Sequence, residues 1–129
     1  MKNFPFVTSK VMQAIFRILC GGIMMAHGTI RIHLGTVGGF GEFLNSKGFM
    51  IGTILAWLIT IIEIAGGFAL AAGFFVRWIC LWFSLELLMG IVLVHAPNGW
   101  FVVGATSGGM EYSVLLVASF LLVASYEKS

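Results

Sequence analysis

Three ionisable side chains interrupt apolar stretches of a sequence in which charge is rare. Arg17 lies early in the first stretch, and Glu63 and Glu86 lie near the middle of the next two. A charged side chain deep in a bilayer is costly, so it usually faces the protein interior and finds a partner. Counted by helical rise, the three residues lie at overlapping depths. The sequence therefore predicts a buried polar cluster of Arg17, Glu63 and Glu86.

This predicted cluster holds two acids against one base. Two carboxylates at close range repel each other, so either one glutamate carries a proton or a further donor joins the cluster. Such a group could carry protons, or it could only fix how the helices pack. The sequence leaves both interpretations open.

A second set of polar residues lies toward the opposite ends of the apolar stretches. His27 and Arg31 share one helical face, and Glu111 begins the last stretch. We predict that these three form an outer cluster that could bind a ligand, although the helix dipole alone would explain an acid at that helix start. His95 has the right depth to join, but on a regular helix it cannot face inward together with Glu86.

The composition places these residues in a membrane protein. The chain has 129 residues, of which 60% are hydrophobic and 9% are charged. Soluble domains carry about 25% charged residues, so this chain has too little charge to cover a surface that faces water. The same values exclude disorder. A net charge of +2 without a run of Lys or Arg gives no reason to expect a nucleic acid partner. At this length we expect a single domain, residues 1–129.

The cysteines and histidines do not indicate a metal site. Cys20 and Cys80 lie far apart inside apolar stretches, without a Cys-x-x-Cys pair. A disulfide framework or a tetrahedral metal site is therefore not expected. His27 and His95 are the obvious candidates for haem ligation, but the direction in which His95 faces argues against it.

Four apolar stretches are long enough to cross a bilayer as helices, since a spanning helix needs about 20 residues. The fold class we predict is all-α, a membrane bundle of four helices. The first outward connection also carries a short amphipathic helix that is ended by Gly48, with Phe40, Phe43 and Leu44 on one face. The expected spans are residues 11–30, 50–75, 76–96 and 108–126.

Basic residues set the expected orientation, because they are more frequent on the cytoplasmic side. One side of the bundle carries Arg31 and Lys47. The other side carries four basic residues, which are Lys2, Lys10, Arg77 and Lys128. We therefore expect both termini in the cytoplasm.

Small residues repeat every four positions on the second predicted span, at Ala65, Ala69 and Gly73. Such residues let helix backbones approach closely in lipid. Ala65 lies about 200° around the helix from Glu63, so this face points away from the predicted cluster. It could receive a second copy of the chain, a partner subunit, or the next helix of the same chain.

Several motifs occur in an order that resembles the DoxX family of small bacterial membrane proteins. The resemblance covers almost the whole chain. The motifs are Arg17-Ile18-Leu19, His27-Gly28 with Arg31, Glu63-Ile64-Ala65-Gly66-Gly67, Gly73 to Arg77, His95 with Asn98-Gly99 and Trp100, and Gly109-x-Glu111-Tyr112.

The resemblance implies a multi-pass protein of the bacterial inner membrane with redox associations. Relatives include the small subunit of a thiosulfate–quinone oxidoreductase, and others are linked to thiols, quinones or oxidative stress. This chain has no cysteine pair and no large soluble domain. If it is an enzyme, we therefore expect it to act as an oxidoreductase subunit together with a partner.

Three functions fit these observations. We favour a redox-linked accessory that binds a quinone or another lipophilic redox molecule, because such a ligand needs an apolar slot with a few polar groups. The alternatives are a scaffold or assembly subunit for a redox partner, and a carrier of a small solute or of protons through Glu63 and Glu86. The sequence fixes neither the substrate nor the electron donor.

Overall fold

The structure is a computed structural model that describes residues 7–126. Over this range it is helical and contains no strand, which confirms the predicted all-α fold. The elements are α1 (Ser9–His33), α2 (Val37–Ser46), α3 (Gly52–Ala72), α4 (Val76–Gly90), the π-helical turn η1 (Ile91–His95), the 3-10 turn η2 (Ala96–Asn98) and α5 (Glu111–Ser125).

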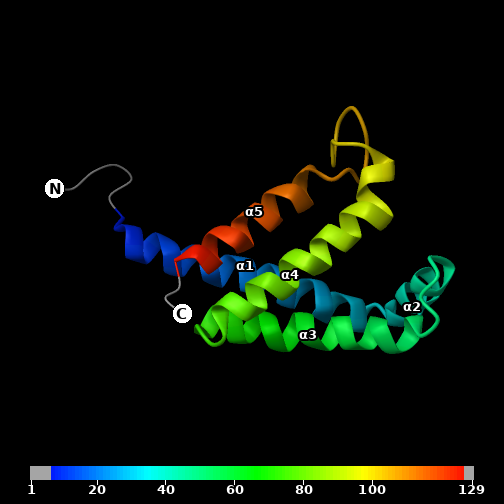
Figure 1. The fold of residues 1–129 in the computed structure, drawn as a ribbon, viewed down its shortest axis with the longest axis horizontal. Helices are drawn as coiled ribbons and strands as arrows, with labels where there is room; N and C mark the ends of the chain where they lie inside the picture. The colour runs from blue at the N-terminus through cyan, green and yellow to red at the C-terminus, as the bar shows by residue number, and fades with distance from the viewer. Residues whose placement is uncertain (1–6, 127–129) are drawn as a thin grey trace.

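The helices pack as two antiparallel pairs. α1 lies along α3 and α4 lies along α5, while α2 packs against α3 (Figure 1). α4 leaves the end of α3 through a short turn and then diverges from it (Figure 1). The two ends of α3 are used below as landmarks. The end that meets α2 is the α2 end, and the end that meets α4 is the turn end.

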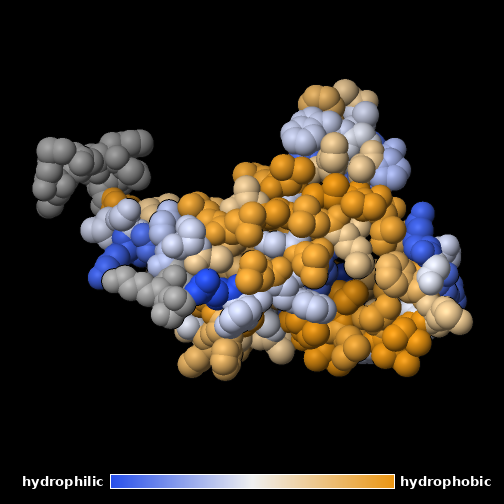
Figure 2. Space-filling model, in the orientation of Figure 1, coloured by the Kyte–Doolittle hydropathy of each residue, from blue (hydrophilic) through white to orange (hydrophobic). Residues whose placement is uncertain are grey.

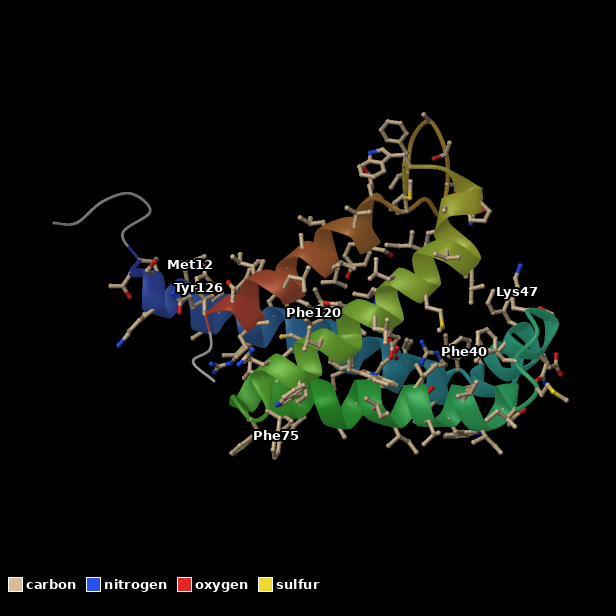
Figure 3. All side chains as sticks on the ribbon, viewed as in Figure 1. Met12, Phe40, Lys47, Phe75, Phe120 and Tyr126 are labelled. Atoms are coloured by element: carbon tan, nitrogen blue, oxygen red, sulfur yellow. The ribbon has the colours of Figure 1, made fainter. Side chains whose placement is uncertain are left out.

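The turn between α3 and α4 needs two residues with left-handed backbone. Gly73 ends α3 with φ 93°, and Phe75 precedes α4 with φ 52°. Glycine commonly ends helices in this conformation because it has no Cβ to clash. Phe75 is exposed and points outward from the turn (Figure 3).

Glycines bring α1 and α3 into backbone contact. A Cβ atom added to Gly21 would lie 2.5 Å from the carbonyl oxygen of Gly67, and one added to Gly28 would lie 2.8 Å from that of Thr60. No larger residue fits at these positions without moving a helix. Small residues are common where helices pack closely in membranes, and here they fix the register that brings Arg31 to Glu63.

The apolar helices form a membrane protein. α1, α3 and the continuous stretch Val76–Asn98 are each long and apolar enough to cross a membrane. Figure 2 shows apolar residues over the middle of one face and hydrophilic residues gathered toward its ends. The largest buried core lies among α1, α3, α4 and α5, where Met24, Leu70, Phe83 and Phe120 are almost inaccessible to solvent.

The fourth apolar helix is shorter than the predicted span. α5 has 15 residues, which rise about 22 Å, less than the roughly 30 Å of a bilayer core. It begins at Glu111 rather than near residue 108 because the preceding loop forms its own hydrogen bonds. In that loop the Met110 N–H donates to the Gly99 carbonyl oxygen over 3.0 Å, and the Gly109 N–H donates to that of Phe101 over 3.1 Å.

Candidate functional site

Glu63 is paired with Arg31 at the centre of the α1–α3 pair. The Arg31 Nη1 donates to Glu63 Oε1 over 2.8 Å and to the Thr60 hydroxyl over 3.0 Å. That hydroxyl in turn donates to the Ala56 carbonyl oxygen over 2.7 Å. Glu63 is 3% exposed. Its charge is therefore balanced inside the bundle by a basic residue from the neighbouring helix.

Arg31 reaches this depth although it lies near the end of α1. Helical side chains lean toward the N-terminus of their own helix. The Arg31 guanidinium therefore reaches back toward Gly28, which packs against Thr60 and Glu63. On its other side the guanidinium lies 4.7 Å from the ring centre of Phe40 in α2, a cation–π contact (Figure 3).

Arg17, the partner predicted for Glu63, lies near the turn end instead. Its Nη2 donates to the Ala71 carbonyl oxygen over 3.4 Å, and its guanidinium lies beside Gly73. A positive charge is favourable there because the C-terminus of a helix carries partial negative charge. The prediction assumed that the helices end at one level, whereas α1 extends beyond the end of α3 (Figure 1).

Glu86 of α4 lies beside the Arg31–Glu63 pair. Its carboxyl group is close enough to interact electrostatically with the Glu63 carboxyl and with the charge of Arg31. The Oε1 atom of Glu86 is buried and has no hydrogen-bond partner within the described part of the chain. The structure thus brings the two predicted glutamates together, with Arg31 in the place expected for Arg17.

Glu86 also lines a partly enclosed groove between α3 and α4. The groove has a volume of about 190 Å³. It exists because α4 diverges from α3 beyond the turn and leaves their facing side chains apart. Apart from Glu86 the lining is hydrophobic and consists of Leu44, Phe49, Leu55, Leu58, Ile59, Ile62, Trp82, Leu85 and Met89.

The short helix α2 closes the α2 end of this region. Its apolar face is buried on α3, where Val37 and Leu44 form a small core with Ala56. The Asn45 side chain accepts a hydrogen bond from the Gly52 N–H over 2.9 Å, while Glu42 is exposed. The predicted amphipathic helix is present, and its apolar face contacts protein.

The outer cluster predicted from His27, Arg31 and Glu111 does not form. Glu111 Oε1 accepts a hydrogen bond from the Val102 N–H over 3.0 Å and so stabilises the loop before α5. Arg31 is held by Glu63. His27 is exposed on α1, in a shallow depression beside Tyr112.

His95 belongs to the same loop as Glu111. Its Nδ1 lies 3.0 Å from the Gly108 carbonyl oxygen. His95 was expected at the depth of the outer cluster, but on a regular helix it could not face inward together with Glu86. The backbone there is not a regular α-helix, because Ile91–His95 forms a π-helical turn. Within residues 7–126, no three metal-ligating side chains lie together.

Trp82 lies beside Glu86 in the groove and was not among the residues predicted from the sequence. The signal was available, because Trp82 precedes Glu86 by four residues and so shares its helical face. The Arg31–Glu63 pair could likewise have been found by aligning the close-packed Gly21 with Gly67 and then allowing Arg31 to lean back along α1.

Comparison with known protein families gives a match that covers the residues of the groove. A family model described as DoxX matches residues 12–96, about two-thirds of the chain. The matched range contains Arg31, Glu63, Glu86 and all the other residues that line the groove, and it ends before α5. No match was found among curated proteins or among solved structures.

Proposed function

The chain belongs to the DoxX family of membrane proteins, and on that premise we propose that it binds a quinone or a related lipophilic redox molecule between α3 and α4. The observation that carries this proposal is a hydrophobic groove with one carboxyl group, that of Glu86, in its wall. Sites for such ligands are mainly apolar, with a few polar groups that orient the ligand.

The charged residues beside the groove support a redox-linked role. Reduction and oxidation of quinone-type molecules consume and release protons. Glu86 is positioned to exchange a proton with a ligand, and Glu63 adjoins it with Arg31 as its counter-charge. Arg31 retains 20% side-chain exposure near the α2 end. Glu86, Glu63 and Arg31 therefore form a path from the groove toward the edge of the bundle.

We propose that the chain is an accessory rather than a complete enzyme. The described residues contain helices and short loops, with no separate domain that could hold an electron donor. Electrons would therefore come from a partner subunit. Ala65 and Gly73 are exposed and Ala69 is half-buried on the side of α3 away from Glu63, which leaves this face open to a partner or a second copy.

We also propose a bacterial inner-membrane location with the α2 end outside and both termini in the cytoplasm. The test is labelling of single cysteines in intact cells, after Cys20 and Cys80 have been replaced. A cysteine at exposed Lys47 in the α2 end should react with a membrane-impermeant maleimide, and one at exposed Lys10 should react only after lysis. The reverse pattern would refute the orientation.

Ligand binding is tested by tryptophan fluorescence in lipid nanodiscs. Addition of a decyl-substituted benzoquinone should quench the Trp82 emission with saturation near one ligand per chain, because a bound quinone ring lies beside that indole. Trp82→Phe should remove the saturable component, and Trp57→Phe should retain it, because Trp57 is an exposed residue of α3 that does not line the groove. Quenching that never saturates in the wild type would refute binding.

A further inference from the structure

We propose that residues 99–110, which connect the stretch Val76–Asn98 to α5, lie in the headgroup region of the bilayer leaflet on the α2 side and do not project beyond the membrane surface. We call this segment the 99–110 loop. The partner that its surface fits is the lipid of that leaflet. The composition, the depth and the hydrogen bonding of the loop support this position independently of any ligand in the groove.

The composition of the 99–110 loop suits contact with lipid. The loop carries no charged residue. Three of its large apolar side chains are exposed, those of Trp100, Phe101 and Val103, and Val103 is 79% exposed. By contrast, the connection that contains α2 exposes the charged residues Glu42 and Lys47. Aromatic residues, tryptophan above all, are frequent at membrane–water interfaces, where the ring contacts acyl chains and the polar edge meets headgroups.

The helix that leads into the loop brings it to the membrane surface. The stretch Val76–Asn98 has 23 residues, which rise about 34 Å, close to the roughly 30 Å of a bilayer core. This stretch is inclined to α1 and α3, and the loop at its end does not extend as far along the molecule as α2 does (Figure 1). An inclined helix gains less height than its length, so the loop begins near the surface.

The loop then returns alongside the helix that it left. The Gly108 carbonyl oxygen lies 3.0 Å from Nδ1 of His95, three residues before Asn98. Soon after Gly108 the chain enters α5, which is too short to cross the bilayer core by itself. The base of the loop therefore lies level with the last turn before Asn98, within the leaflet.

Part of the loop is hydrogen-bonded as a segment within a membrane must be, because backbone groups that water does not reach need partners in the protein. Backbone N–H groups at its base donate to carbonyl oxygens of the loop or to the Glu111 carboxylate. These are the N–H groups of Val102, Gly108, Gly109 and Met110.

The remaining N–H groups limit how deep the loop can lie. Those of residues 100, 101 and 103–107 donate to no acceptor within residues 7–126. An unpaired N–H is costly in hydrocarbon, so these groups need water or the oxygen atoms of lipid headgroups. Both are present at the headgroup level, where the exposed apolar side chains of the loop can also contact acyl chains.

The first experiment places a fluorescent probe on the loop. After Cys20 and Cys80 have been replaced, Val103→Cys is labelled with the environment-sensitive dye NBD in phosphatidylcholine nanodiscs. Lys47→Cys, at an exposed position at the end of α2, is the matched control. The dye at position 103 should emit at shorter wavelength than the dye at position 47. Aqueous iodide should quench it at least about threefold less, because side chains at the headgroup level are shielded from water.

The second experiment uses Trp100 and needs no label. In the variant Trp57→Phe/Trp78→Phe/Trp82→Phe, Trp100 is the only tryptophan. Lipids brominated near the headgroup end of the acyl chain should quench its emission more strongly than lipids brominated near the tail end. This measurement keeps both native cysteines, so it remains valid if the cysteine-free protein does not fold.

The two experiments can each overturn the proposal. Equal emission wavelength and equal iodide quenching at positions 103 and 47 would place the loop in water. Lack of quenching of Trp100 by either brominated lipid would lead to the same conclusion. Stronger quenching by the lipid brominated near the tail end would place the loop in the hydrocarbon core and would contradict the headgroup position.

Discussion

Helix α3 meets its two long neighbours in opposite ways. Against α1 it presents Gly67, and the two backbones touch at Gly21 and Gly28. Against α4 it presents larger side chains such as Ile59 and Ile62, and beyond the turn the helices separate and leave a groove. The first interface contains the Arg31–Glu63 ion pair, and at the second a buried carboxyl oxygen of Glu86 has no hydrogen-bond partner among residues 7–126.

This difference indicates that the two interfaces of α3 have different roles. Close backbone packing holds α1 and α3 in a fixed register and so positions the Arg31–Glu63 pair. On the α4 side only Gly66 packs closely, against Phe83, and the larger side chains along the groove keep the two backbones apart. We infer that the α1–α3 interface mainly stabilises the fold, while the α3–α4 interface remains open for a ligand. Four substitutions test this comparison.

The largest effect is expected at the ion pair. Arg31→Met would leave Glu63, which is 3% exposed, without its counter-charge. Removing one member of a buried ion pair typically costs about 3–5 kcal/mol, and we expect the free energy of unfolding in bilayers to fall by that amount. The double variant Arg31→Met/Glu63→Gln should recover much of the loss, because the orphaned charge is then gone.

Arg77→Met is the control for the ion pair, because Arg77 is exposed at the start of α4. It should change the free energy of unfolding by less than about 0.5 kcal/mol, as surface substitutions usually do. Equal losses for Arg31→Met and Arg77→Met would show that the buried pair does not stabilise the bundle.

The next effect is expected from two adjacent glycines of α1. Gly21→Ala would put a Cβ 2.5 Å from the Gly67 carbonyl oxygen, whereas a Cβ on Gly22 meets nothing within 4 Å. Overpacking typically costs about 1–3 kcal/mol, so Gly21→Ala should lower the free energy of unfolding by that much. Gly22→Ala should raise it by up to about 1 kcal/mol, because alanine favours helix. Similar values for both variants would contradict the close-packed interface.

These two interfaces differ in how far the sequence predicts them. Hydrophobic stretches define the helices because each must satisfy its backbone internally in lipid, and the all-α membrane fold follows. Depth counting placed Glu63 near Glu86, which the structure also brings together. It failed for Arg17, because the offset between α1 and α3 is set by glycine packing, which hydropathy does not report.

The groove could not be predicted from the sequence, for a related reason. Its width depends on the angle at which α4 leaves the turn at Gly73 and Phe75, and the sequence shows only that a turn occurs. The direction in which His95 faces could not be predicted either, because the π-helical turn Ile91–His95 breaks the 3.6-residue period on which facing arguments depend. In both cases the deciding geometry lies in the irregular backbone between regular helices.

The groove should tolerate a large residue that the α1–α3 interface would not. Leu85 is 60% exposed and lines the groove, so Leu85→Trp should fill the groove with little strain. We expect the affinity for decyl-benzoquinone to fall at least tenfold, while the free energy of unfolding changes by less than about 0.5 kcal/mol. Leu81→Trp, at another exposed position of α4 outside the groove, should leave the affinity unchanged. Undiminished binding to Leu85→Trp would place the ligand elsewhere.

The smallest effect is expected where α2 covers the ion pair. Phe40→Leu keeps an apolar side chain but removes the ring that lies 4.7 Å from the Arg31 guanidinium, a contact worth about 0.5–1 kcal/mol at a partly exposed site. Phe43→Leu is the matched control, because the ring of Phe43 meets the exposed Lys47 at 5.6 Å and should contribute less. The Phe40 effect should also vanish in an Arg31→Met background, since the cation is then absent. If it persists there, Phe40 stabilises α2 through packing alone, and α2 does not contribute to holding the Arg31–Glu63 pair.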